Sequence, residues 1–176
     1  MAAVRERLTK LLLVFQDPEH RRRVALLSRN LLFEGLPRRT IGRLLPKMFV
    51  KDYVPGDVVF RAGDPGSSLF VILAGEVEIL RPDPGSGGEQ RIAVFGDNTA
   101  FGELALVDDE PRSATARVSK PTKMLILYRT DFESMSVGDP KVAMALARNL
   151  LRVLARYVRS AGQARQAGGD AGTPSR

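Results

Sequence analysis

The segment from residue 48 to residue 128 constrains the fold more than any other part of the chain. It contains seven short runs rich in β-branched and aromatic residues, and turn residues separate each run from the next. Short runs of this composition between turn signals are typical of strands. The segment therefore predicts an antiparallel barrel or sandwich. The predicted strands are residues 48–54, 58–61, 69–74, 77–81, 91–95, 114–119 and 123–128.

Turn residues predict where the chain reverses between these runs. The motif Pro55-Gly56-Asp57, residues 63–66, Gly75 and Gly96 stand at positions where a reversal requires a positive φ or a close approach of two backbones. Residues 82–90 contain three glycines and two prolines, which predicts a flexible hairpin tip.

Helices are predicted on both sides of the β-rich segment. Apolar residues recur near helical spacing before residue 50, around a break at Asp17-Pro18, and indicate two or three helices. Asp139-Pro140 supplies an N-cap followed by proline, and a helix of about twenty residues is expected there. After Ser160 the composition predicts a disordered tail. The expected division is an N-terminal helical extension at 1–31, a domain including its C-terminal helix at 32–160, and the tail at 161–176.

The net charge of +7 is distributed unevenly. Residues 1–50 carry 11 basic and 4 acidic side chains, residues 51–139 carry 9 and 15, and residues 140–176 carry 7 and 1. The basic side chains that flank the acidic middle segment could be exposed to solvent, pair with acidic residues of the same molecule, bind a protein partner, or contact nucleic acid. The sequence alone leaves these alternatives open.

The residue types that are missing limit the chemistry. The chain has no cysteine and one histidine, His20, which precedes the β-rich segment. A disulfide framework, a zinc site, a thiol nucleophile and histidine-based catalysis are therefore excluded, and we expect neither an enzyme nor a metal centre. The longest apolar run, residues 11–15, is too short to span a membrane, and no secretory signal is evident. A cytoplasmic protein is expected.

Residues 101–115 carry the pattern most directly related to function. They read Phe-Gly-Glu-Leu-Ala-Leu-Val-Asp-Asp-Glu-Pro-Arg-Ser-Ala-Thr, with Glu103 and Arg112 nine positions apart on a predicted short helix and its exit. The planar guanidinium of an arginine can hold the oxygens of a phosphate, and a nearby glutamate can accept hydrogen bonds from a ribose hydroxyl. A helix N-terminus near Gly102 would add backbone N–H groups that favour an anion. The spacing indicates a clamp for a phosphosugar.

Residues 101–115 resemble the phosphate-binding cassette of cyclic nucleotide-binding domains, and residues 54–57 and 74–77 match the family's corner motifs. The resemblance implies an α+β fold: a jelly-roll-like β-roll, or double-stranded β-helix, with N-terminal helices and a C-terminal lid helix. It also implies cAMP or cGMP as the ligand, with no further cofactor. By resemblance, Arg112, Ser113 and Ala105 face the phosphate, Glu103 and Gly102 face the ribose, and Phe101, Leu104, Ala114 and Thr115 complete the cassette.

The base is expected against Ile79 and Val94, beneath the C-terminal helix, where Arg152 could stack on it. Ordinary core packing would also explain the two apolar residues, and a solvated helix face would explain the arginine. Ser113 leaves the choice between cAMP and cGMP open, and the resemblance to bacterial catabolite-activator-like regulators favours cAMP.

Two interpretations compete with ligand sensing. An ion pair between Glu103 and Arg112 could merely pin a loop, or a protein-interaction module could retain a vestigial pocket while its basic flanking helices bind the partner. We expect a sensor whose C-terminal helix closes over the ligand and changes the surface shown to a protein partner, or to a second copy bound through the N- or C-terminal helices. The 16 residues after Ser160 are too few for a helix-turn-helix, so no DNA-binding domain is expected in this chain.

Overall fold

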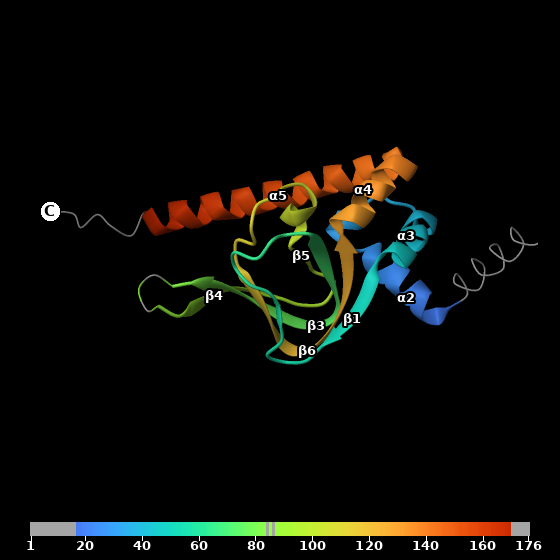
Figure 1. Ribbon diagram of the computed structural model, residues 1–176. Coiled ribbons are helices and arrows are strands. Elements are labelled where there is room, and N and C mark those ends of the chain that lie inside the picture. Colours follow the sequence, from blue (N-terminus) through green and yellow to red (C-terminus); the bar gives the residue numbers. More distant parts are fainter. Residues whose placement is uncertain (1–16, 84, 86, 170–176) are drawn as a thin grey trace, which may run out of the picture.

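A computed structural model describes residues 17–83, 85 and 87–169 of the protein. Helices lie before and after a single antiparallel sheet, and Figure 1 shows α5 running along the top of the curled sheet while α2 and α3 lie beside it. The helical elements are α2 (Pro18–Leu27), η1 (Leu31–Phe33), α3 (Arg38–Leu44), η2 (Leu45–Lys47), η3 (Glu103–Leu106), α4 (Arg129–Gly138) and α5 (Pro140–Gly169).

Within the described residues, six strands form the sheet, in the order β1-β6-β3-β4, with β2 paired to β6 and β5 paired to β3. Every pairing is antiparallel, and the sheet curls into a roll with helices on one side (Figure 1). The predicted α+β class and the antiparallel β-roll are confirmed. The strands are β1 (Phe49–Tyr53), β2 (Val58–Phe60), β3 (Ser68–Pro82), β4 (Glu89–Phe95), β5 (Ala100–Phe101) and β6 (Thr115–Tyr128).

Two long strands replace four of the predicted short ones. The runs 69–74 and 77–81 form one continuous strand, β3, and the runs 114–119 and 123–128 lie in β6 and the residue before it. The pairing register between these two strands shifts three times between Ile72 and Val77. Bulges of this kind bend a strand without ending it, so the turn residues at these positions mark a bend and not a reversal.

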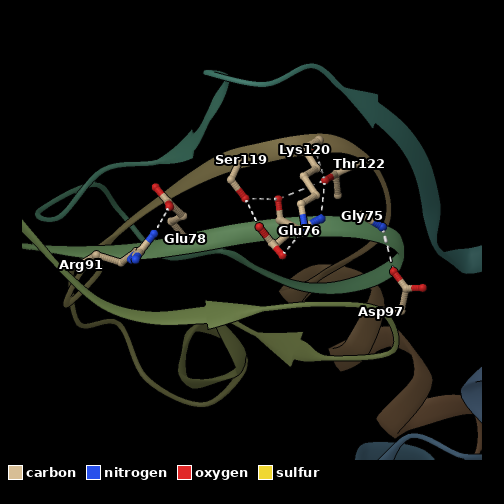
Figure 2. Close-up of polar contacts among 8 residues, drawn as sticks. All are labelled: Gly75, Glu76, Glu78, Arg91, Asp97, Ser119, Lys120 and Thr122. Atoms are coloured by element: carbon tan, nitrogen blue, oxygen red, sulfur yellow. Dashed lines mark hydrogen bonds and ion pairs between the residues drawn. The ribbon is translucent and has the colours of Figure 1, made fainter.

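Gly75 lies at this bend and allows β3 and β6 to approach closely. Its φ is +113°, and a Cβ atom there would lie 2.3 Å from Thr122 Oγ1 and 2.5 Å from the carbonyl oxygen of Pro121. Figure 2 shows the polar contacts around it, including the Gly75 N–H that donates to Asp97 Oδ1 at 2.8 Å. The close approach predicted for Gly75 is present. The same prediction for Gly96 is wrong, because its φ is not positive and a Cβ there would have open space around it.

The alternation of side chains along the strands divides the interior into two apolar clusters. Leu69 and Val71 of β3 pack with the helices, in a cluster that includes Ile41 of α3 and Leu146 of α5. Phe70, between them in sequence, points into the roll, in a cluster with other inward-facing residues. The helices therefore cover one face of the sheet, and the inside of the roll remains for a binding site. Members of the inner cluster include Tyr53, Ile72, Val77, Ile79, Phe101, Val118, Met124 and Ile126.

The flanking helices agree with the prediction at one end and differ at the other. Asp17 accepts a hydrogen bond from the Glu19 N–H at 2.9 Å and caps α2, as the predicted break at Asp17-Pro18 requires. The last helix, α5, continues nine residues beyond the expected end at Ser160, to Gly169. Residues 161–169 are therefore helical, where a disordered tail was expected. The rest of the tail and residues 1–16 of the extension lie outside the described residues, and the division into domains stays a prediction.

Candidate functional site

The candidate site is built where β5 ends and η3 begins. Gly102 caps η3 in the left-handed region, with φ of 69°, and a Cβ atom at this position would lie 2.7 Å from Arg112 Nη1. Only glycine gives the guanidinium this access to the main chain. The turn brings Glu103, the first residue of η3, to the same region as Arg112.

Arg112 is held in place by main-chain oxygens and aromatic rings. Its Nη1 donates to the carbonyl oxygen of Gly102 at 3.0 Å, and its Nη2 donates to the carbonyl oxygen of Ser68 at 2.7 Å. The guanidinium carbon lies 4.2 Å from the centre of the Phe60 ring, and only 9% of the residue is exposed. Nε is buried and has no hydrogen-bond partner in the described part of the chain. Burial lowers the pKa of the guanidinium, and the carboxylates of Glu103 and Asp64 oppose that shift.

Glu103 is also buried, with 6% of its surface exposed. Burial raises the pKa of its carboxyl, while a backbone hydrogen bond and the charge of Arg112 lower it. The two side chains form no ion pair: among the described residues, the hydrogen bonds of the Arg112 guanidinium go to Ser68 and Gly102. The interpretation that a Glu103–Arg112 ion pair pins the loop is therefore wrong. Each group remains available to a ligand of its own.

A cavity of about 610 Å³ joins the two groups inside the roll. This volume is within the range of small-molecule sites, which are mostly apolar with a few placed polar groups. Its lining combines residues of the cassette with residues of β3 and β4, which are apolar except for Arg81. Of the predicted site residues, the lining includes Ile79, Phe101, Gly102, Glu103, Leu104, Ala105, Arg112, Ser113 and Ala114.

Three predicted residues lie outside this cavity. Thr115 is buried, and its Oγ1 accepts a hydrogen bond from the Ala62 N–H at 3.1 Å. Val94 is 46% exposed. Its neighbours Ala93 and Phe95 line the cavity, so the side chain of Val94 lies on the opposite face of β4, beside Glu78 of β3. Arg152 lies 3.8 Å from Glu34 on the exposed side of α5. Neither Val94 nor Arg152 lines the larger cavity in the described structure, and their assignment to the base stays a prediction.

A smaller cavity of about 230 Å³ lies between η1, the β4–β5 connection and α5, and it shares Glu103 with the larger one. Val153 and Arg156 of α5 line it. Arg156, four residues after Arg152 on α5, therefore lines the smaller cavity, whereas Arg152 lines neither of the two. Sequence reasoning missed five residues of the larger cavity that lie outside the cassette, although the alternation along β4 and the register with β3 could have identified Ala93 and Phe95. The missed residues are Phe60, Arg81, Ile92, Ala93 and Phe95.

Comparison with known proteins gives consistent matches. The profile of the cyclic nucleotide-binding domain matches residues 50–137. A CRP-like cAMP-activated global transcriptional regulator of Mycobacterium tuberculosis is 31% identical over 76% of this chain and 58% of its own length. The cyclic AMP receptor protein of Thermus thermophilus is 34% identical over 74% of this chain and 58% of its own length. The solved N-terminal domain of a transcriptional regulator from Streptomyces coelicolor is 35% identical, with a TM-score of 0.68, covering 80% of this chain and 94% of that one.

The chain spans just over half the length of the two curated relatives. Among the described residues, none of the helices combines the length and the hydrophobicity that a membrane-spanning segment requires. Within the same residues, no group of three or more histidine, cysteine, aspartate or glutamate side chains is placed to hold a metal ion.

Proposed function

Because the chain belongs to the cyclic nucleotide-binding domain family, we propose that its larger cavity binds a purine nucleoside cyclic monophosphate. The buried guanidinium of Arg112 is the observation that carries this proposal, since it faces the cavity without a carboxylate partner. A charge taken out of water is costly unless a counter-charge meets it. The cyclic phosphate supplies one negative charge at this position, beside the backbone of Ala105 and Ser113.

The sugar and the base then occupy the rest of the cavity. Glu103 accepts a hydrogen bond from the ribose 2′-hydroxyl, and Gly102 leaves room for the sugar next to the main chain. The base lies toward Ile79, where β3 and β4 provide an apolar wall. Between the two nucleotides we propose cAMP, because two relatives carry cyclic AMP in their names. Titration of the ligand-free protein with cAMP and with cGMP, followed by calorimetry, tests this choice.

Replacing Glu103 with glutamine is expected to weaken cAMP binding about 10-fold or more, because the 2′-hydroxyl loses a charge-assisted hydrogen bond worth about 1.5–3 kcal/mol. The binding of 2′-deoxy-cAMP should change much less, since that ligand has no hydroxyl to lose. Calorimetric titration of both ligands measures the two effects. A variant that loses equal affinity for both ligands would show that Glu103 does not contact the ribose.

We further propose that ligand binding is signalled through α5. Asn149 of α5 is fully buried and donates to the carbonyl oxygens of Leu32 at 3.0 Å and Glu34 at 2.8 Å, so the helix is tied to η1. Glu103 lines both the ligand cavity and the smaller cavity under α5. A ligand that engages Glu103 therefore changes what α5 packs against and favours the helix position that closes the site. In this proposal the protein is a cytoplasmic sensor without catalytic activity.

The exposed side of α5 also supports self-association. Met144, Leu151 and Val158 are exposed, and they recur every seven residues on one helix. This period is typical of a coiled-coil seam, where the apolar residues of two helices interlock. We propose that two copies of the chain associate through this face.

The substitution Leu151→Glu is expected to shift the protein from dimer to monomer, because it places a carboxylate in the middle of the seam. Sedimentation velocity at several protein concentrations measures the change. Val94→Glu, an exposed position on β4, provides the control and should leave the oligomeric state unaltered. A protein that sediments as a monomer at all concentrations before any substitution would rule out this association.

A further inference from the structure

A row of cations follows one continuous piece of chain outside the ligand site. Arg39 and Arg43 lie on the exposed side of α3, Lys47 ends η2, and Lys51 lies on β1. The four residues recur every four positions, and we call them the α3 strip. None of them forms an ion pair in the described part of the chain, and α3 and η2 contain no acidic residue. Lys51 Nζ lies over the Tyr53 ring, 4.6 Å from its centre.

The strip is extended, and its cations do not converge on one point. Eight residues of helix between Arg39 and Lys47 rise by roughly 12–16 Å, and four residues of extended chain to Lys51 add up to about 13 Å. A compact anion such as a free phosphate could contact only one or two of these groups. A row of this kind fits an anion that repeats along a chain.

An exposed aromatic pair lies beside the end of the strip. Phe49 is 58% exposed, and it packs edge-on against Tyr128, which is 39% exposed, with ring centres 5.5 Å apart. Phe49 stands between Lys47 and Lys51 in the chain, and on β1 it shares a face with Lys51. Proteins that bind single-stranded nucleic acid combine these two elements: cations along the backbone and aromatic rings on which unpaired bases stack.

We propose that the α3 strip and the aromatic pair bind single-stranded nucleic acid. The cations alone would bind several kinds of anionic partner, and the aromatic pair favours one of them. A duplex offers phosphates but keeps its bases stacked inside, and a bilayer surface or an acidic polypeptide offers no repeating unpaired base. A single strand presents a phosphate and an exposed aromatic face at every nucleotide, so it uses both features together.

The test is fluorescence anisotropy with a labelled 20-nucleotide oligothymidylate, titrated with the full chain at several salt concentrations. Four phosphate contacts predict a slope of log K against log [salt] near −3, since each contact on a single strand contributes about −0.7. The triple variant Arg39→Gln, Arg43→Gln, Lys47→Gln should flatten this slope by about 2. Its matched control carries the same charge change on α5 (Lys141→Gln, Arg148→Gln, Arg159→Gln) and should keep the slope.

Phe49→Ala tests the stacking separately from the charge. It should weaken binding about 10-fold with an unchanged salt slope, whereas Val50→Ala on the opposite face of β1 should have little effect. Thermal melting verifies that each variant is folded. The proposal fails if the α5 control flattens the slope as much as the strip variant, if Phe49→Ala has no effect, or if a 20-base-pair duplex, polyglutamate or phosphatidylserine vesicles bind as tightly through the same residues.

Discussion

Replacing Arg112 with lysine is expected to weaken cyclic nucleotide binding at least about 100-fold. The planar guanidinium is held by Ser68 and Gly102 with its face against Phe60, and it offers several N–H groups at fixed angles. Lysine keeps the charge but loses this fork, and hydrogen bonds to charged groups contribute about 1.5–3 kcal/mol each. Losing two of them corresponds to about 3 kcal/mol or more of binding free energy. Calorimetric titration with cAMP and cGMP measures the loss.

A matched control shows whether the loss of binding is specific to Arg112 or follows from any replacement of an arginine by lysine. Arg117 lies on β6, outside the cavity, and forms a 2.5 Å ion pair with Glu89. Arg117→Lys should therefore bind the nucleotide as tightly as the unsubstituted protein. Thermal melting of both variants identifies any loss of folded protein, because Arg112 also supports the turn at Gly102. If folded Arg112→Lys bound cAMP with unchanged affinity, the guanidinium would not be the phosphate ligand.

Gly75→Ala is expected to lower the free energy of unfolding by about 2–5 kcal/mol. A positive φ at a residue with a Cβ atom costs about 1–2 kcal/mol, and forcing extra atoms into a packed interior costs about 1–3 kcal/mol. Both costs apply here, because the new methyl group would overlap backbone atoms of Pro121 and Thr122, and not merely a flexible side chain. Domains of this size are stable by only about 5–15 kcal/mol. Urea unfolding followed by circular dichroism measures the difference.

Gly96→Ala is the corresponding control. Gly75 lies within β3 and Gly96 follows β4, and the Gly75 N–H donates to Asp97, the residue after Gly96. A Cβ atom at Gly96, however, would contact nothing within 4 Å. The midpoint of unfolding for Gly96→Ala should lie close to that of the unsubstituted protein. Equal destabilisation by the two substitutions would contradict the close approach of β3 and β6 at Gly75.

Local patterns predicted the strand content of the fold well, and they predicted its long-range arrangement less well. The β-rich runs and the antiparallel class followed from residue types and turn signals in short windows. The continuity of β3 through Gly75 did not, because a glycine at a bulge and a glycine at a reversal are alike in a single sequence. The end of α5 was misplaced for a related reason: its last residues are rich in alanine and glutamine as well as glycine, so composition alone did not mark where the helix stops.

The candidate site shows the same division. The cassette is contiguous, so one stretch of chain carries Glu103, Arg112 and the glycine between β5 and η3, and the structure brings them to one cavity. The residues of β3 and β4 that line the cavity depend instead on the register with which β4 pairs with β3. Val94 was assigned to this lining although its neighbour Ala93 is the residue opposite Ile79. A shift of one residue moves a side chain to the other face of a sheet, and only the pairing partner specifies which face is correct.

The most direct test of the account is isothermal titration of the full chain, freed of any co-purified ligand, with cAMP and with cGMP. The account predicts saturable binding of one nucleotide per chain, with cAMP bound more tightly, and loss of that binding in Arg112→Lys. Well-folded protein that releases no heat and shows no thermal shift with either nucleotide at millimolar concentration would contradict it.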